Sequence, residues 1–179
     1  MNILFVNYTY PIPTSGGTER VIDNLSRYFR EVGISSHVLF FEGEKGKNSS
    51  IVNSLNFTDL NSLDEIKEYI ISNNIKIIII FKKYLDKRIL NVLRQKDCKI
   101  IYSLRYSIDD SRLKNVTIIN NNHLRKSFTW KLKKCFAGLY IKYVEYVDKK
   151  KISLISNYSD SVVLLSSRII DDFIIKYKV

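Results

Sequence analysis

The residues best suited to chemistry lie in one long loop near the start of the chain. The loop covers residues 8–17, follows a short apolar run at residues 2–7, contains two prolines and ends in the pair Gly16-Gly17, where a helical segment begins. At the start of a helix, unpaired backbone N–H groups and the helix dipole attract an anion, and glycine lets a phosphate approach closely. The loop therefore indicates an anion-binding turn. The alternative reading is that the two glycines only permit a tight turn into the helix.

Other patterns that carry chemistry are missing from the sequence. The loop is not G-x-G-x-x-G and no Walker A lysine follows it, so the ordinary dinucleotide and nucleoside-triphosphate fingerprints are absent. The histidines His37 and His123 are isolated, and spacing joins no Ser or Cys to them in a triad. Cys98 and Cys135 fit neither a zinc site nor a disulfide framework. No metal and no resident cofactor are expected.

A second feature is a basic stretch at residues 123–151, where nine lysines and arginines accompany only two acidic residues. Aromatic and apolar residues are interleaved with the charges. A helix of this composition can lie on an anionic membrane surface. Alternatively, its apolar stripe, which includes Tyr143, packs on the protein while the lysines are solvated. The residues expected to contact an anionic surface are Arg125, Lys126, Lys131, Lys133 and Lys134.

These residues must be positioned by a framework in which strand-length apolar runs alternate with helical segments. That alternation is typical of a parallel sheet covered by helices. Several of the runs are apolar at consecutive positions, as in strands that are buried on both faces. Six strands are expected, the third weakly patterned, at residues 2–7, 36–41, 51–57, 75–81, 99–104 and 161–165.

Helices are expected wherever apolar side chains recur at steps of three and four residues. The first spans about residues 18–32 and ends at Gly33. The second opens at Ser62, whose spacing to Glu65 fits a capping box, and stops at residues 73–74. The remaining helical segments are residues 84–95, residues 121–151 as one helix or two joined near Gly138, and a last helix from Ser166 or Ser167.

Composition places the chain among compact globular proteins. Its 179 residues are 45% hydrophobic and 26% charged, with six glycines and two prolines, which excludes disordered and collagen-like classes. We expect residues 1–179 to form one α/β domain, a Rossmann-like doubly wound, mainly parallel sheet with helices on both faces. The net charge of +11 favours anionic partners. No apolar run approaches the roughly 20 residues that span a bilayer, and no secretory signal pattern is present, so a cytoplasmic location is expected.

The two ends of the chain carry a family resemblance. The beginning of the chain resembles the N-terminal half of retaining family-4 glycosyltransferases. The residues that carry this resemblance are the first strand at residues 2–7, Pro11, the run Gly16-Gly17-Thr18-Glu19-Arg20-Val21, Asn24-Leu25, Gly33 and the second strand. Residues 159–166 are similar to the last strand of that domain. Members of the family are two-domain enzymes of the GT-B fold.

The resemblance implies an acceptor-binding domain that faces a nucleotide-sugar-binding domain across a cleft. The donor would bind mainly in that C-terminal domain, which is not part of these 179 residues, so no transferase activity is expected from them alone. The implied acceptor is a sugar or a lipid-linked sugar in cell-envelope polysaccharide or glycolipid synthesis, at the inner face of the membrane. The resemblance places Gly16, Gly17, Thr18 and Glu19 near the donor diphosphate, and Tyr8, Tyr10 and Arg105 on the acceptor side.

Arg105 departs from the family pattern. Many members have a histidine after the strand that corresponds to residues 99–104. Arginine is permanently charged and pairs with phosphate or carboxylate, so it cannot act as a neutral proton acceptor. Four explanations stay open: an acidic acceptor, a degenerate enzyme, an alignment shifted by a residue or two, and a solvent-exposed residue at a strand end. No catalytic residue is assigned.

The leading hypothesis is the acceptor-binding half of a retaining hexosyltransferase, completed by a C-terminal domain on the same or a separate chain. The alternative is a non-catalytic basic binding module for an anionic membrane surface or nucleic acid. Nucleic acid is the less favoured partner, because no RNP, KH, zinc-finger or basic-zipper signature is present.

Overall fold

The computed structural model describes residues 1–46, 50–81, 85–104 and 137–164. These residues form six strands, four α-helices and one short 3-10 helix. In chain order they are β1 (Asn2–Val6), α1 (Gly17–Glu31), β2 (Ser35–Phe40), β3 (Asn53–Asn56), the 3-10 helix η1 (Phe57–Asp59), α2 (Asp64–Ser72), β4 (Ile75–Ile80), α3 (Lys87–Leu93), β5 (Lys99–Leu104), α6 (Ala137–Tyr158) and β6 (Ser161–Leu164).

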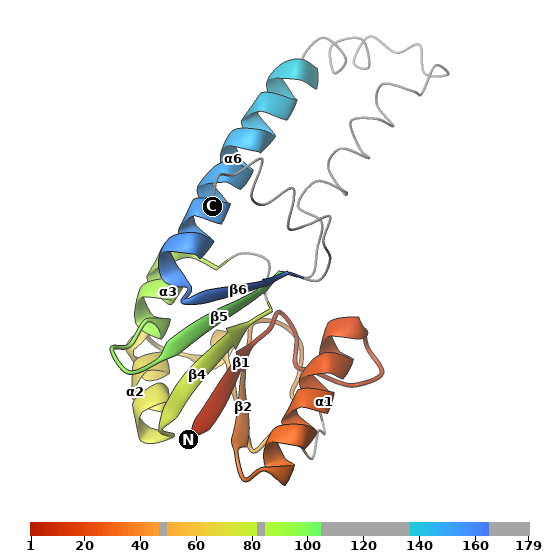
Figure 1. The fold of residues 1–179 in the computed structure, drawn as a ribbon, viewed down its shortest axis with the longest axis vertical. Coiled ribbons are helices and arrows are strands. Elements are labelled where there is room, and N and C mark those ends of the chain that lie inside the picture. Colours follow the sequence, from red (N-terminus) through yellow and green to blue (C-terminus); the bar gives the residue numbers. More distant parts are fainter. Residues whose placement is uncertain (47–49, 82–84, 105–136, 165–179) are drawn as a thin grey trace. The chain divides into compact units, whose positions relative to one another are not determined.

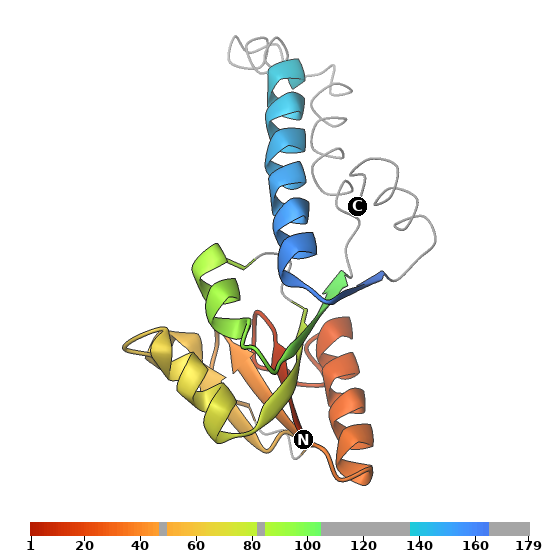
Figure 2. The same ribbon diagram turned by 60° about the vertical axis from the view of Figure 1, so that its left-hand side comes forward.

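All six strands pair in parallel in a single sheet of order β3-β2-β1-β4-β5-β6. The chain runs outward from β1 to β3, crosses to β4 and then runs outward to β6. Helix α1 covers one face of the sheet, and α2 and α3 cover the other (Figures 1 and 2). This is the Rossmann-like doubly wound fold that the sequence predicts. Its strand order reverses between β1 and β4, and ligands of such sheets bind at the carboxyl ends of the strands at that point.

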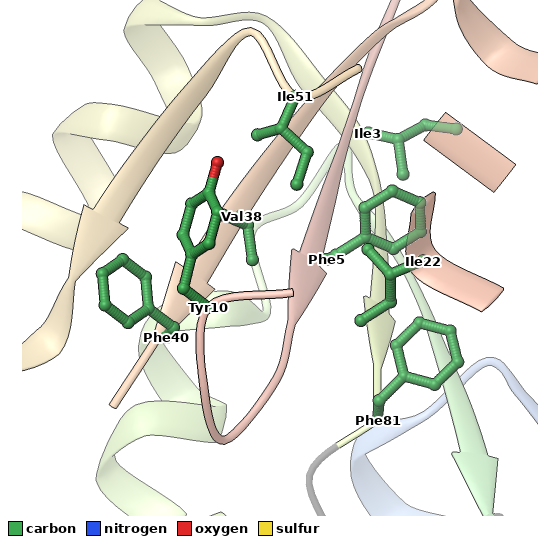
Figure 3. Close-up of a cluster of buried hydrophobic side chains, with 8 residues drawn as sticks. All are labelled: Ile3, Phe5, Tyr10, Ile22, Val38, Phe40, Ile51 and Phe81. Carbon is green, nitrogen blue, oxygen red and sulfur yellow. The ribbon is translucent and has the colours of Figure 1, made fainter. Parts of the chain in front are cut away.

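The hydrophobic core explains why β1 is apolar at consecutive positions. Successive side chains of a strand point to opposite faces. Ile3 and Phe5 belong to the cluster shown in Figure 3, together with Ile22 of α1. Leu4 and Val6, the alternate residues, are equally buried. Both faces of β1 are therefore covered by protein.

Helix α1 ends at Gly33, as predicted, and the structure shows that it does so in a Schellman motif. Gly33 has a positive φ of 75°. Its N–H donates to the carbonyl of Arg30 at 3.1 Å, and the N–H of Ile34 donates to the carbonyl of Phe29 at 2.8 Å. These two bonds satisfy carbonyls that the helix itself leaves open, and the left-handed conformation that they need favours glycine.

We expect Gly33→Ala to lower the free energy of unfolding by about 1 kcal/mol, because an L side chain is strained in the left-handed region. No atom lies within 4 Å of a Cβ built at Gly33, so backbone strain is the sole cause. Gly17→Ala is the matched control, since it also meets no atom within 4 Å and carries no positive φ. Urea denaturation should show a change of less than about 0.5 kcal/mol for the control. Equal losses in the two variants would contradict the argument.

The bounds of α2, α3 and β3 differ by two residues or more from the sequence prediction. Helix α2 begins at Asp64 rather than Ser62: Glu65 Oε1 does accept the N–H of Ser62 at 3.1 Å and that of Asn61 at 2.9 Å, but no side chain caps the helix. Only half of the capping box is formed, and the helix starts two residues later. Helix α3 begins at Lys87, because Asp86 is its N-cap and accepts the N–H of Arg88 at 2.7 Å. Strand β3 has only four residues.

Helix α6 differs most from its prediction. The structure describes it over Ala137–Tyr158, and its end lies seven residues beyond the expected one. Tyr143, expected on the packed stripe, is exposed, whereas Ile152 and Ile155 are buried. The earlier part of that segment and the helix expected from Ser166 or Ser167 lie outside the described residues.

The chain divides into two compact units within α6. The sheet belongs to a unit of Met1–Arg105 and Ser156–Leu165, and α6 up to Ile155 belongs to the other. In the part of the chain that the structure describes, no helix combines the length and the apolarity needed to cross a bilayer.

Candidate functional site

The candidate site is the carboxyl edge of β1 and β2, where the loop after β1 leads into α1. The N–H of Asn7 donates to the carbonyl of Leu39 at 3.0 Å, and the N–H of Phe81 donates to the carbonyl of Val6 at 2.8 Å. These bonds bring the ends of β1, β2 and β4 to one level at the reversal of strand order. The N–H groups of Phe41 and Glu42 both donate to the carbonyl of Tyr8 at 3.0 Å. The loop is thus tied to the segment that follows β2.

Glu19 fixes the loop from the first turn of α1. Its Oε1 accepts hydrogen bonds from Asn7 Nδ2 and Thr9 Oγ1, both at 3.3 Å. Asn7 is buried and also donates to the carbonyl of Thr9 at 3.0 Å. The end of β1, the loop and the helix start are therefore linked through a single carboxylate.

The two glycines have different surroundings. A Cβ at Gly16 would lie 2.4 Å from Glu19 Oε2, whereas no atom lies within 4 Å of a Cβ at Gly17. Gly16 thus leaves room for the Glu19 carboxylate, and the space beside Gly17 is open. A carboxylate stabilises the positive end of the helix dipole and lowers its attraction for a further anion. The same carboxylate can accept hydrogen bonds from the hydroxyl groups of a neutral ligand.

The sequence matches no family model and no curated protein. The resemblance to family-4 glycosyltransferases accordingly rests on the residues of the two ends of the chain.

The two tyrosines expected on the acceptor side occupy different environments. Tyr8 is largely exposed, and its hydroxyl donates to the carboxylate of Glu42. This hydrogen bond, with smaller contributions from burial and from the charge of Glu42, raises the pKa of Tyr8 above its usual 10.0. Tyr10 is only 4% exposed, and its ring packs edge-on against Phe40 at a centroid distance of 5.4 Å (Figure 3). Tyr10 is a core residue, and Tyr8 is the tyrosine of this loop that a ligand can reach.

A polar pocket that sequence reasoning missed lies at the carboxyl ends of β2 and β3. Its volume is about 310 Å³, near the lower limit of roughly 300 Å³ for small-molecule sites. Gly43, in the loop after β2, has a φ of 86°, and Asn56 Oδ1 accepts the N–H of Thr58 at 3.2 Å. A glycine shortly after a strand and an Asn at the end of the next one are the only sequence signals for it. The lining residues are Phe40, Gly43, Glu44, Lys45, Ser54, Asn56 and Asp59.

Two other candidate residues of the sequence have structural environments. His37 is buried in β2, and its Nδ1 lies 2.9 Å from the hydroxyl of Tyr69 in α2. The Cys98 thiol lies 3.1 Å from the carbonyl of Ile75, and burial raises its pKa. Within residues 1–46, 50–81, 85–104 and 137–164, no three His, Cys, Asp or Glu side chains are grouped as metal ligands would be.

The other predicted contact residues lie outside the described part of the chain. They are Arg105 on the acceptor side and the membrane-surface residues Arg125, Lys126, Lys131, Lys133 and Lys134.

Proposed function

We propose that this chain is the acceptor-binding half of a retaining, sugar-nucleotide-dependent glycosyltransferase of the GT-B type. It acts in cell-envelope polysaccharide or glycolipid synthesis, in the cytoplasm at the inner face of the membrane. The observation that carries the proposal is the turn Gly16-Gly17, held by Glu19, Asn7 and Thr9 where the strand order reverses. Ligands of doubly wound sheets bind at that position.

The side chains around this turn suit hydroxyl-rich ligands. The carboxylates of Glu19 and Glu42 accept hydrogen bonds, and the hydroxyl of Tyr8 can both donate and accept. In the proposal these groups orient the acceptor sugar, and the backbone at Gly17 and Thr18 faces the donor diphosphate. The nucleotide sugar itself binds mainly in a second domain, carried by the same or a separate chain.

The test is a transfer assay on the native gene product, isolated from its source cells with an antibody raised against this domain. Radiolabelled UDP- and GDP-sugars are supplied together with a lipid extract of the same cells. We expect label to pass to the extract. A native product that transfers no label from any of these donors would overturn the proposal.

Variants of the native product test the role of the turn. Glu19→Gln should lower the transfer rate roughly tenfold to a hundredfold, because it removes a charged hydrogen-bond acceptor. Glu31→Gln, an exposed glutamate at the other end of α1, is the matched control and should leave the rate unchanged. Equal transfer rates in the two variants would show that Glu19 does not contribute to the binding site.

The 179 residues alone should bind neither UDP-glucose nor GDP-mannose, because the donor site belongs to the second domain. Titration calorimetry measures this directly. Stoichiometric binding of either nucleotide sugar to this chain would contradict the assignment of the donor site to another domain. It would not contradict glycosyltransferase activity, because the donor site would then lie within these residues.

A further inference from the structure

Among the α6 residues whose exposure the structure describes, the exposed ones gather on one face of the helix. Leu139, Tyr143 and Tyr146 are 65%, 64% and 56% exposed, and Lys142, Lys149 and Lys150 are also exposed. Their spacing of three and four residues places them along one stripe. Ile155 is buried and follows Tyr146 by nine residues, which at about 100° per residue is the opposite side. We call these six residues the α6 face.

The chemistry of the α6 face is cationic and amphipathic. Helix α6 as a whole carries four lysines and two acidic residues, and none of the six residues of the α6 face is acidic. None of the three lysines of this face takes part in an ion pair with a residue whose side chain the structure describes. Lys150 Nζ lies 4.7 Å from the ring centroid of Tyr146, so cation and ring share one patch. The face therefore offers positive charge, two amphipathic rings and one aliphatic side chain to a partner.

An anionic bilayer surface matches this combination. Lysine stems bury against apolar surface while their ammonium groups reach lipid phosphates, and tyrosine rings partition to the headgroup level. Helix α6 has 22 residues and is about 33 Å long at 1.5 Å per residue, which suits a helix lying in the interface plane. A phosphate backbone of nucleic acid would pair with the lysines but would leave Leu139 in water.

We propose that the α6 face docks on anionic lipid bilayers, with the helix axis parallel to the membrane. This surface consists of residues other than Arg125, Lys126, Lys131, Lys133 and Lys134, and it stands independently of the glycosyltransferase proposal. Docking through this surface places the α6 face in contact with the lipid headgroups.

The test is co-sedimentation of the full chain with vesicles of phosphatidylcholine alone or with 30% phosphatidylglycerol, about one anionic lipid in three. Each well-placed lysine contributes about a fivefold gain in partitioning, equivalent to about 1 kcal/mol. The triple variant Lys142→Gln/Lys149→Gln/Lys150→Gln should therefore bind anionic vesicles about a hundredfold more weakly. The chain should not bind phosphatidylcholine alone.

The matched control removes three exposed lysines from the sheet unit, Lys67→Gln/Lys87→Gln/Lys96→Gln, and has the same net charge. It should lose less than about fivefold. Equal losses in the two triples would show attraction by overall charge and would overturn the proposal, as would a wild-type chain that does not bind anionic vesicles. Circular dichroism confirms that both triples retain the helix content of the wild type.

A second variant tests the aromatic part of the face without changing charge. Tyr143→Ser/Tyr146→Ser should weaken binding to anionic vesicles at least about fivefold, and the remaining binding should become more sensitive to salt. Unchanged binding would overturn the proposal.

Fluorescence anisotropy with a single-stranded oligonucleotide tests nucleic acid as the competing partner. If the lysine triple variant lost only oligonucleotide binding, the α6 face would be assigned to nucleic acid and the proposal would be overturned.

Discussion

Truncation of Phe5 to alanine is expected to lower the free energy of unfolding by about 3–5 kcal/mol. Phe5 is fully buried in the middle of β1. The centroid of its ring lies 6.3 Å from that of Phe29 and 6.0 Å from that of Phe81. Deleting the ring loses its burial from water and leaves a cavity that the flanking strands cannot close. The total free energy of unfolding of such domains is about 5–15 kcal/mol, so the variant should be close to unfolding.

The matched control is Tyr28→Ala, which deletes an aromatic ring on the outside of α1. Tyr28 is exposed and touches the same neighbour, Phe29, at a centroid distance of 5.9 Å. It should cost less than about 1 kcal/mol. Urea denaturation followed by far-ultraviolet circular dichroism gives both values. Similar losses for the two variants would mean that the cluster around Phe5 is not the core of the sheet unit.

Much of this fold could be predicted from the sequence because the four central strands, β2, β1, β4 and β5, are largely covered on both faces. A run such as Ile77-Ile78-Ile79-Ile80 has few alternatives to a central parallel strand, and β4 occupies that place beside β1. Gly33 predicted the end of α1 correctly, since a Schellman motif needs a residue that tolerates positive φ. The predicted start of α2 was wrong because it depended on a single polar side chain, that of Ser62, whose hydroxyl does not cap the helix.

The candidate site could be located but not built from sequence. The fold class alone points to the loop after β1, and Gly16-Gly17 marks its helix end. That Glu19 turns back to Asn7 and Thr9 depends on side-chain rotamers and on the loop path, neither of which has a sequence signature. Likewise, Tyr8 and Tyr10 have similar neighbours in sequence, yet only Tyr10 enters the core; the chain bends at Tyr8.

A second large effect is expected from pH, through the pair His37 and Tyr69. His37 is 2% exposed, its Nδ1 bonds to the Tyr69 hydroxyl, and its Nε2 has no hydrogen-bond partner among the described residues. A charged imidazolium would need an acceptor at both nitrogens. Burial lowers the pKa of His37 below its usual 6.5. Between that lowered pKa and 6.5 the unfolded chain binds more protons than the folded one, so stability falls as the pH falls through this window.

The variant His37→Gln should abolish this part of the pH dependence. Glutamine does not titrate, yet its amide can still bond to Tyr69. The free energy of unfolding, measured by urea titration at several pH values below 6.5, should fall less steeply in the variant, by up to about 1.4 kcal/mol per pH unit. Identical slopes in wild type and variant would mean that His37 titrates normally in the folded chain.

Tyr69→Phe is the complementary variant, because it keeps the histidine and removes the hydroxyl that bonds to its Nδ1. It should lower the free energy of unfolding by about 1–3 kcal/mol at neutral pH, since the buried imidazole then has no partner among the described residues at either nitrogen. The fall in stability below pH 6.5 should persist.

The same variant tests the pH dependence of stability at alkaline pH. Burial raises the pKa of Tyr69 from 10.0 to about 12, so wild-type stability should fall as the pH rises through that window. Tyr69→Phe should lose this component, because phenylalanine has no proton to release.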